Sequence, residues 1–118
     1  MVFVTAGGCK TQLENLTQVL VSAFQGSTIY RHTDPFRLLH DVLHQKIDAV
    51  FLVTEKDKAN SLEFVQMLRR QKPDIPVFAI SDTEDLRKQA TDAGVNDYLI
   101  LPVGEQKLWD VMQSVKIR

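Results

Sequence analysis

The sequence predicts an α/β fold in which a parallel β-sheet lies between two layers of helices. Two observations lead to this prediction. Short apolar runs typical of buried strands alternate along the chain with segments whose apolar residues recur at helical spacing. No linker, repeat or low-complexity segment interrupts the alternation, which implies right-handed βαβ units. We therefore expect five strands and five helices in a single domain over residues 1–118.

The first quarter of the chain predicts a strand, a helix and a second strand. Residues 2–5 are apolar and β-prone, and Gly7-Gly8 ends this strand. Gly26 follows the first helix at the position where a left-handed residue ends many helices. Residues 27–31 form a more polar strand, which we place at the edge of the sheet. The inward positions of the first helix are Leu13, Leu16, Val19, Leu20 and Ala23.

Asp34-Pro35 predicts the start of a second helix, because an aspartate caps free N–H groups and proline suits the first helical position. Its apolar stripe is Phe36, Leu39, Val42 and Leu43. Residues 48–54 then form a strand whose continuous apolar run is bounded by polar residues, as a strand buried on both faces of a parallel sheet requires. Chemistry in an open α/β sheet lies just past the carboxyl ends of such strands. Here that end carries Val53 and Thr54, neither of which ionises at neutral pH.

The second half repeats the alternation. A third helix carries Arg69-Arg70 near its C-terminus, where cations complement the helix dipole. Strands are predicted over residues 76–81 and 98–101, and Gly94 ends the fourth helix between them. Ser81, Asp82 or Thr83 is expected to cap that fourth helix. The inward positions of the last three helices are Leu62, Val65 and Leu68, then Leu86, Ala90 and Ala93, then Leu108, Val111, Met112 and Val115.

Composition argues against several functional classes. A net charge of −1 gives no broad electrostatic reason to bind nucleic acid or an anionic membrane. No apolar run approaches the roughly 20 residues of a membrane span, and the N-terminus lacks the features of a signal peptide. The single cysteine, Cys9, excludes an intrachain disulfide and suits a reducing compartment. We expect a cytoplasmic protein without a cofactor.

Residues 48–52, 62–64, 76–77 and 93–99 together resemble the receiver domain of bacterial response regulators. The resemblance covers essentially the whole chain, is strongest between residues 48 and 103, and is weak in the first 30 residues. It implies a flavodoxin-like (βα)5 three-layer sandwich whose five-stranded parallel sheet has the order 2-1-3-4-5. It also implies a bacterial two-component signalling or phosphorelay role.

An active receiver accepts a phosphoryl group on an aspartate that ends its third strand. Two acidic residues after the first strand help to bind Mg²⁺, a Ser or Thr ends the fourth strand, and a lysine precedes a proline after the fifth. The carboxylate is the nucleophile, the hard cation takes oxygen ligands, and the cation and lysine offset charge on the transferring group.

The resemblance places other residues at most of these positions. Val53 stands at the nucleophile position, and Leu101 at the lysine position. The acidic pair falls on Thr5-Ala6 or Ala6-Gly7. Ser81, Pro102 and the switch aromatic Tyr98 are retained. We therefore predict a degenerate receiver that is not phosphorylated, is not an enzyme and acts through protein contacts. Whether the Leu101-Pro102 bond is cis, as the family's Lys-Pro bond suggests, stays open.

The Gly7–Thr11 loop supports an alternative function. It follows a strand and opens a helix, whose free N–H groups could hold an anion in a small ligand-binding domain or enzyme. It matches neither the P-loop nor the G-x-G-x-x-G pattern, so a simple turn is the favoured interpretation. Cys9 within it could have a lowered thiol pKa at a helix N-terminus, but a small residue in a turn is again favoured.

Two further features of the sequence are candidate binding sites. His40 and His44 lie four residues apart, the spacing of a metal pair, but no third ligand is evident and a solvated helix face is favoured. Trp109 lies at the margin of the apolar stripe of the last helix, where tryptophan either contacts partners or simply packs. In receivers, the face made by the fourth helix, fifth strand and fifth helix often contacts partners. The resemblance would place Tyr98 and Trp109 on or beside that face, for binding a protein or a second copy.

Overall fold

The computed structural model describes residues 2–7, 10–32, 40, 44, 46–54, 60–72, 74–101 and 103–116. Its centre is a five-stranded sheet in the order β2-β1-β3-β4-β5, and every neighbouring pair of strands is parallel. The strands are β1 (Val2–Gly7), β2 (Thr28–His32), β3 (Ala49–Val53), β4 (Val77–Ser81) and β5 (Asp97–Ile100). The predicted fold and strand order are confirmed, including the place of the second strand at an edge.

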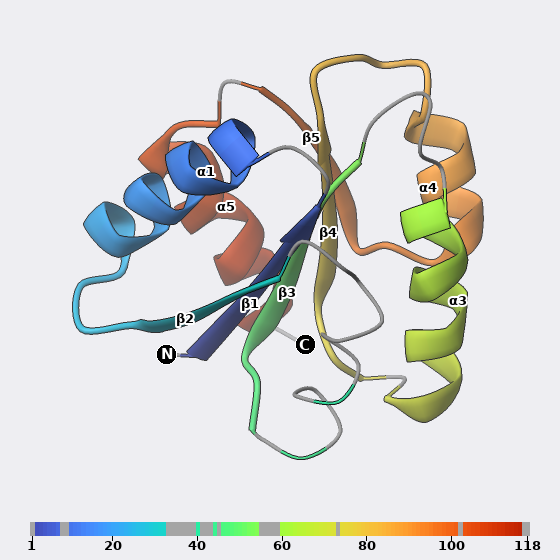
Figure 1. The fold of residues 1–118 in the computed structure, drawn as a ribbon, viewed down its shortest axis with the longest axis horizontal. Coiled ribbons are helices and arrows are strands. Elements are labelled where there is room, and N and C mark those ends of the chain that lie inside the picture. Colours follow the sequence, from blue (N-terminus) through green and yellow to red (C-terminus); the bar gives the residue numbers. More distant parts are fainter. Residues whose placement is uncertain are drawn as a thin grey trace.

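Helices cover both faces of this sheet, α1 and α5 on one side and α3 and α4 on the other (Figure 1). The described helices are α1 (Lys10–Ala23), α3 (Asn60–Gln71), α4 (Arg87–Ala93) and α5 (Glu105–Lys116). The helix predicted to begin at Asp34-Pro35, with its stripe of Phe36, Leu39, Val42 and Leu43, lies outside the described residues, apart from isolated positions. The side chains of Leu62 and Val115 also lie outside them.

The core has two halves because successive side chains of a strand point to opposite faces of the sheet. Towards α1 and α5, Phe51 of β3 packs edge-on against Phe3 of β1 at 5.7 Å between ring centroids, and it stacks on Phe78 of β4 at 5.2 Å. Towards α3 and α4, the fully buried residues include Val50 and Phe64. Burying each such side chain stabilises the fold by up to about 1.5–3 kcal/mol.

Strand β1 extends two residues beyond its predicted end. Ala6 and Gly7 pair with Leu52 and Val53 of β3, so the glycine belongs to the sheet instead of ending the strand. Composition alone marked Gly7 as a breaker, but pairing with a central strand outweighs that preference.

The cap predicted for α4 is wrong. Leu86 occupies the N-cap position and makes no side-chain capping hydrogen bond. The two hydroxyl residues close the loop before it instead: Ser81 Oγ accepts from the Thr83 N–H at 3.3 Å, and Thr83 Oγ1 accepts from the Asp85 N–H at 3.2 Å. Short polar side chains compete for nearby backbone groups in this way. The predicted helix end is confirmed, since Gly94 has a φ of +110°.

Arg69 ties the end of α3 to the two segments beside it. Its Nε donates to the Gly94 carbonyl at 2.8 Å, and its Nη1 donates to the Ile75 carbonyl at 2.5 Å. Its Nη2 donates to Asn96 Oδ1, which also accepts from the Val77 N–H at 2.9 Å. The sequence predicted that this cation complements the helix dipole. The structure adds that it satisfies carbonyl groups at the α4–β5 turn and before β4.

Candidate receiver pocket at the carboxyl ends of the strands

The carboxyl end of β3 is buried among apolar groups. Val53 is 2% exposed and belongs to the core beneath α1 and α5. The next residue, Thr54, is held to β4, because its N–H donates to the Ile80 carbonyl at 2.7 Å and its hydroxyl reaches the same oxygen at 3.3 Å. The position that the resemblance assigns to the nucleophile therefore has an aliphatic side chain packed into the core.

Gly7 of β1 lies directly against Val53. A Cβ added to Gly7 would be 2.7 Å from both the Cβ and the carbonyl oxygen of Val53. Contacts this short do not occur without a shift, and the oxygen belongs to the backbone of a central strand. Only glycine fits here, so a carboxylate could not be added at residue 7 without moving β1 away from β3.

The other positions to which the resemblance assigns the acidic pair, Thr5 and Ala6, are also buried. Ala6 is fully buried in the core on the α3 and α4 side. Thr5 is fully buried as well, and its hydroxyl has no hydrogen-bond partner among the described residues. Strand β1, from Val2 to Gly7, carries no carboxylate.

Ser81 and Leu101 stand at the ends of β4 and β5. Ser81 is fully buried, and its backbone carbonyl accepts from the Leu101 N–H at 2.9 Å. Leu101 is partly buried against the core beneath α1 and α5. Pro102 lies outside the described residues, so the conformation of the Leu101-Pro102 bond is not described.

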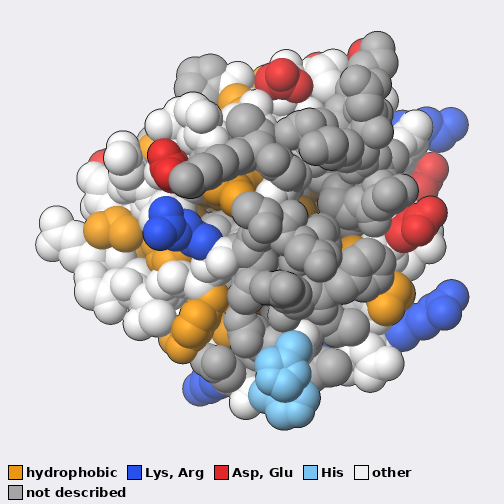
Figure 2. Space-filling model, in the orientation of Figure 1, with side chains coloured by type: hydrophobic (Ala, Val, Ile, Leu, Met, Phe, Trp, Pro, Cys, Tyr) orange, Lys and Arg blue, Asp and Glu red, His pale blue; other side chains and the backbone are white. Residues whose placement is uncertain are grey.

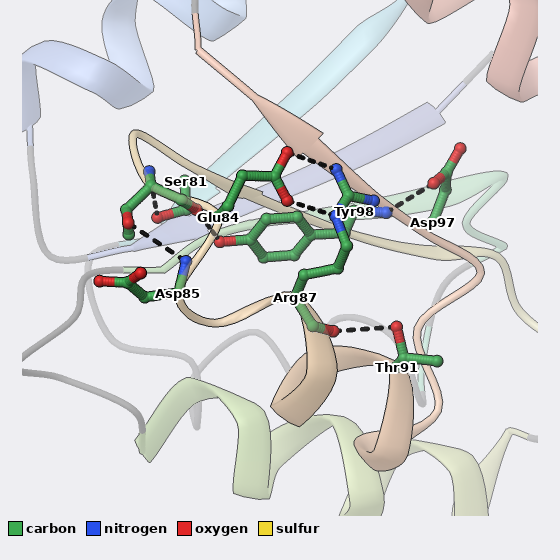
Figure 3. Close-up of polar contacts among 8 residues, drawn as sticks. Ser81, Glu84, Asp85, Arg87, Thr91, Asp97 and Tyr98 are labelled. Atoms are coloured by element: carbon green, nitrogen blue, oxygen red, sulfur yellow. Dashed lines mark hydrogen bonds and ion pairs between the residues drawn. The ribbon is translucent and has the colours of Figure 1, made fainter.

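Tyr98 of β5 points inward, and two contacts hold its side chain in place. It is 3% exposed, and its hydroxyl donates to the Thr83 carbonyl. The Arg87 guanidinium lies over its ring, 5.0 Å from the centroid, in a cation–π arrangement. Glu84 holds that guanidinium with contacts of 2.5 Å and 3.0 Å (Figure 3). The hydrogen bond between them lowers the pKa of Glu84 and raises that of Arg87.

Trp109 lies in a different layer from Tyr98. Its ring packs on Phe24, just after α1, at 4.7 Å between centroids, while 41% of the residue stays exposed. Tyr98 packs in the core half covered by α3 and α4. The structure therefore does not bring these two predicted interface residues into contact. Figure 2 shows described hydrophobic side chains at several places on one face of the molecule.

The structure describes only some of the remaining candidates. Gly8 and Cys9 lie outside the described residues, and Lys10 and Thr11 begin α1. The His40 and His44 rings stack on each other at 4.3 Å, and both residues are exposed. Across the described part of the chain, no cluster of three metal-ligating side chains occurs, and no helix could cross a membrane.

Sequence reasoning missed a cavity of about 480 Å³ between α1 and the loops that follow β4 and β5. The described residues that line it are Gln12, Asn15, Leu16, Gln18, Val19, Asp82, Leu101 and Val103. Two of its walls come from segments far apart in the sequence, so no local pattern could have indicated it.

The family model for the response regulator receiver domain matches residues 9–113. This chain therefore belongs to the response regulator receiver domain family, whose members are signalling modules of two-component systems. No significant match was found among curated protein sequences.

Solved receiver structures share the fold at low sequence identity. The receiver domain of a sensor histidine kinase from Pseudomonas aeruginosa, solved with magnesium in its active-site cleft, is 17% identical with a TM-score of 0.84, and the alignment covers 99% of this chain and 98% of that one. A receiver domain protein from Clostridium thermocellum is 18% identical with a TM-score of 0.79, covering 97% and 92%. A Francisella response regulator receiver domain is 18% identical with a TM-score of 0.75, covering 99% and 97%.

Proposed function

We propose that this protein is a degenerate receiver domain, a cytoplasmic signalling module that works without phosphorylation and acts through protein contacts. The observation that carries the proposal is the packing of Val53 against Gly7. A buried valine stands where the family resemblance places the phosphoacceptor, and the neighbouring strand has no room for a side chain.

The other changes around Val53 agree with one another. Clustered carboxylates repel one another unless a metal and a lysine compensate for the charge. Here the acidic positions hold Thr5, Ala6 or Gly7, and the lysine position holds Leu101. These substitutions remove the metal ligands, the compensating cation and the nucleophile together. Loss of the whole phosphorylation pocket is expected to remove the metal ligands, the cation and the nucleophile together.

Loss of the acceptor removes the usual source of switching free energy. A two-state element shifts only when an input binds or modifies one state in preference to the other. Ser81 is retained, but no phosphoryl group is available to draw its hydroxyl across the pocket. Tyr98 is already inward and hydrogen-bonded to the Thr83 carbonyl. We infer that this side chain keeps its inward position without phosphorylation and that signalling depends on binding.

The test is incubation with Mg²⁺ and acetyl phosphate, followed by intact-mass spectrometry under conditions that preserve acylphosphate. An intact receiver domain serves as the positive control in the same buffer. We expect no added phosphoryl group on this protein. Acylphosphate on any aspartate would refute the proposal. Val53→Asp is the matched variant, and we expect it to remain unphosphorylated because the lysine and the acidic pair are still missing.

The contact surface is proposed to centre on Trp109, with binding of a protein partner or a second copy through the helix 4, strand 5 and helix 5 region. Tyr98 would support that region from inside, since it is itself buried. Sedimentation velocity and a pull-down from the native cell, each with wild type and Trp109→Ala, test this. Val21→Ala, which truncates another exposed apolar residue (48% exposed), is the control. Self-association and partner recovery that are the same in Trp109→Ala as in wild type would exclude Trp109 as the contact.

A further inference from the structure

Helix α4 is short and buries little apolar surface. It has seven residues, and the two that are buried, Ala90 and Ala93, have small side chains. Its N-cap residue, Leu86, provides no side-chain hydrogen bond. Helix α3, by contrast, buries large side chains such as Phe64 and Leu68. A helix as short as α4 is not stable in isolation, so its position depends on contacts with neighbouring elements.

The two ends of α4 are held by different neighbours. After its C-terminal end, the Gly94 carbonyl accepts from Arg69 Nε of α3 at 2.8 Å. At its N-terminal end, the Arg87 guanidinium lies over the Tyr98 ring of β5, 5.0 Å from the centroid. The Tyr98 hydroxyl donates to the carbonyl of Thr83, in the loop that leads into the helix. The first turn of α4 is therefore connected to β5 through one aromatic side chain.

Two carboxylates hold Arg87 above the ring. Glu84, three residues earlier, contacts the guanidinium nitrogens at 2.5 Å and 3.0 Å. Figure 3 shows Asp97 of β5 on the other side of the guanidinium. The hydrogen bond with Glu84 is the main cause that raises the pKa of Arg87, and the charges of Glu84 and Asp97 act in the same direction. Glu84 and Arg87 are both exposed, so added salt screens their attraction.

The loop before α4 depends on the same aromatic contact. The Thr83 N–H donates to Ser81 Oγ at 3.3 Å, and the Asp85 N–H donates to Thr83 Oγ1 at 3.2 Å. Both distances are at the long end of the range for hydrogen bonds in proteins. When Tyr98 releases the Thr83 carbonyl, this loop is therefore free to move together with the first turn of α4.

We propose that residues 82–93, which comprise α4 and most of the loop before it, form a latch that opens as a local unit, and that Arg87 is the positioning residue that keeps it closed over Tyr98. Opening uncovers the Leu86 side chain and the Tyr98 ring, which are 4% and 3% exposed in the closed latch. An apolar surface beside β5 is then available that the closed protein lacks. Segments with little buried apolar area open most readily in folded proteins.

The latch goes beyond the proposed function and does not depend on it. It rests on the contacts between α4 and β5, and not on the residues around Val53. The input that the latch can sense is a competing charge, because an exposed ion pair holds Arg87 in place.

Amide hydrogen exchange, measured by NMR on ¹⁵N-labelled protein, tests the latch. The amides of residues 90–93 should exchange about three- to tenfold faster in Arg87→Gln than in wild type, while those of α3 and α5 stay unchanged. Lys88→Gln removes the same charge from the next, exposed position of α4 and should exchange as wild type does. Arg87→Lys should be intermediate, because an ammonium group keeps the charge but cannot pair with Glu84 through two nitrogens.

Three outcomes of this experiment would overturn the proposal. The first is equal exchange in Arg87→Gln and Lys88→Gln. The second is faster exchange in Arg87→Gln that extends equally to α3 and α5, since this would be global destabilisation. The third is wild-type exchange of residues 90–93 that is as slow as that of the central strands, since α4 would then not open separately.

A second measurement follows the Tyr98 ring itself. Nitration by tetranitromethane, located by peptide mass spectrometry, should be faster at Tyr98 in Arg87→Gln than in wild type, with Tyr30 of β2 as the unchanged internal reference. In a Tyr98→Leu background, Arg87→Gln should have no further effect on exchange in α4, because no ring remains for the guanidinium to hold. Unchanged nitration of Tyr98, or an Arg87→Gln effect that persists in full without the ring, would refute the latch.

Discussion

Replacement of Gly7 by alanine should destabilise the protein. The added Cβ would lie 2.7 Å from both the Cβ and the carbonyl oxygen of Val53, and 3.3 Å from its Cα. Relief requires β1 and β3 to separate in the middle of the sheet, where the pair Gly7 and Val53 continues a ladder that begins at Phe3 and Ala49. Overpacking of this kind costs typically about 1–3 kcal/mol. Because a backbone atom takes part, we expect a value at the upper end.

The free energy of unfolding is measured by urea denaturation followed by far-UV circular dichroism, for wild type, Gly7→Ala and Gly104→Ala. Gly104 is a matched control, because a Cβ there would meet nothing within 4 Å. Alanine at that position should be neutral or slightly stabilising. A Gly7→Ala protein as stable as Gly104→Ala would refute the packing argument.

Three other predictions concern single polar groups. Thr5→Val should raise the free energy of unfolding by about 1 kcal/mol, because it removes a buried hydroxyl without a partner in favour of a methyl group of the same shape; a loss of stability in urea denaturation would show that the hydroxyl is satisfied. Arg69→Lys should cost about 1–3 kcal/mol, because one ammonium group cannot serve the carbonyls of Gly94 and Ile75 and the side chain of Asn96 together; thermal unfolding with Arg70→Lys as control tests this. Glu84→Gln should have a small effect at neutral pH that disappears in acid. Because the pKa of Glu84 is lowered, its contribution to stability is present above the ordinary carboxyl pKa and is lost as the pH falls through the lowered value. Unfolding midpoints of wild type and Glu84→Gln, measured over a pH series, would contradict this if the two proteins diverged in acid.

The fold could be predicted because local signals and tertiary demands agree along this chain. The apolar run at residues 49–53 is too short for a buried helix and too apolar for an exposed strand, so a central strand is the consistent interpretation. The glycine that ends α4 was predictable for a similar reason. Few other residues adopt a φ of +110° without strain, so its position after an amphipathic segment indicates a helix end.

The misses arose where a residue's role depends on a distant segment. The local sequence predicts that Gly7 ends the first strand, but its pairing with Val53 of β3 includes it in the sheet. Arg69 has the local signature of a dipole-complementing cation, but its donors reach the carbonyl of Gly94, 25 residues away. The cavity beside α1 combines Gln12 with Val103. Spacing within a helix or strand carries no information about such pairs.

Trp109 packed on Phe24 gives the protein an optical reporter. It is the only tryptophan in the sequence. Its indole packs on Phe24, just after α1, and 41% of the residue stays exposed to solvent. Its emission should therefore respond to any change in how α1 and α5 lie together. Helix α1 also forms one wall of the cavity. Binding events that move α1 could therefore be followed in unmodified protein by fluorescence alone, without a label and at concentrations far below those that NMR requires.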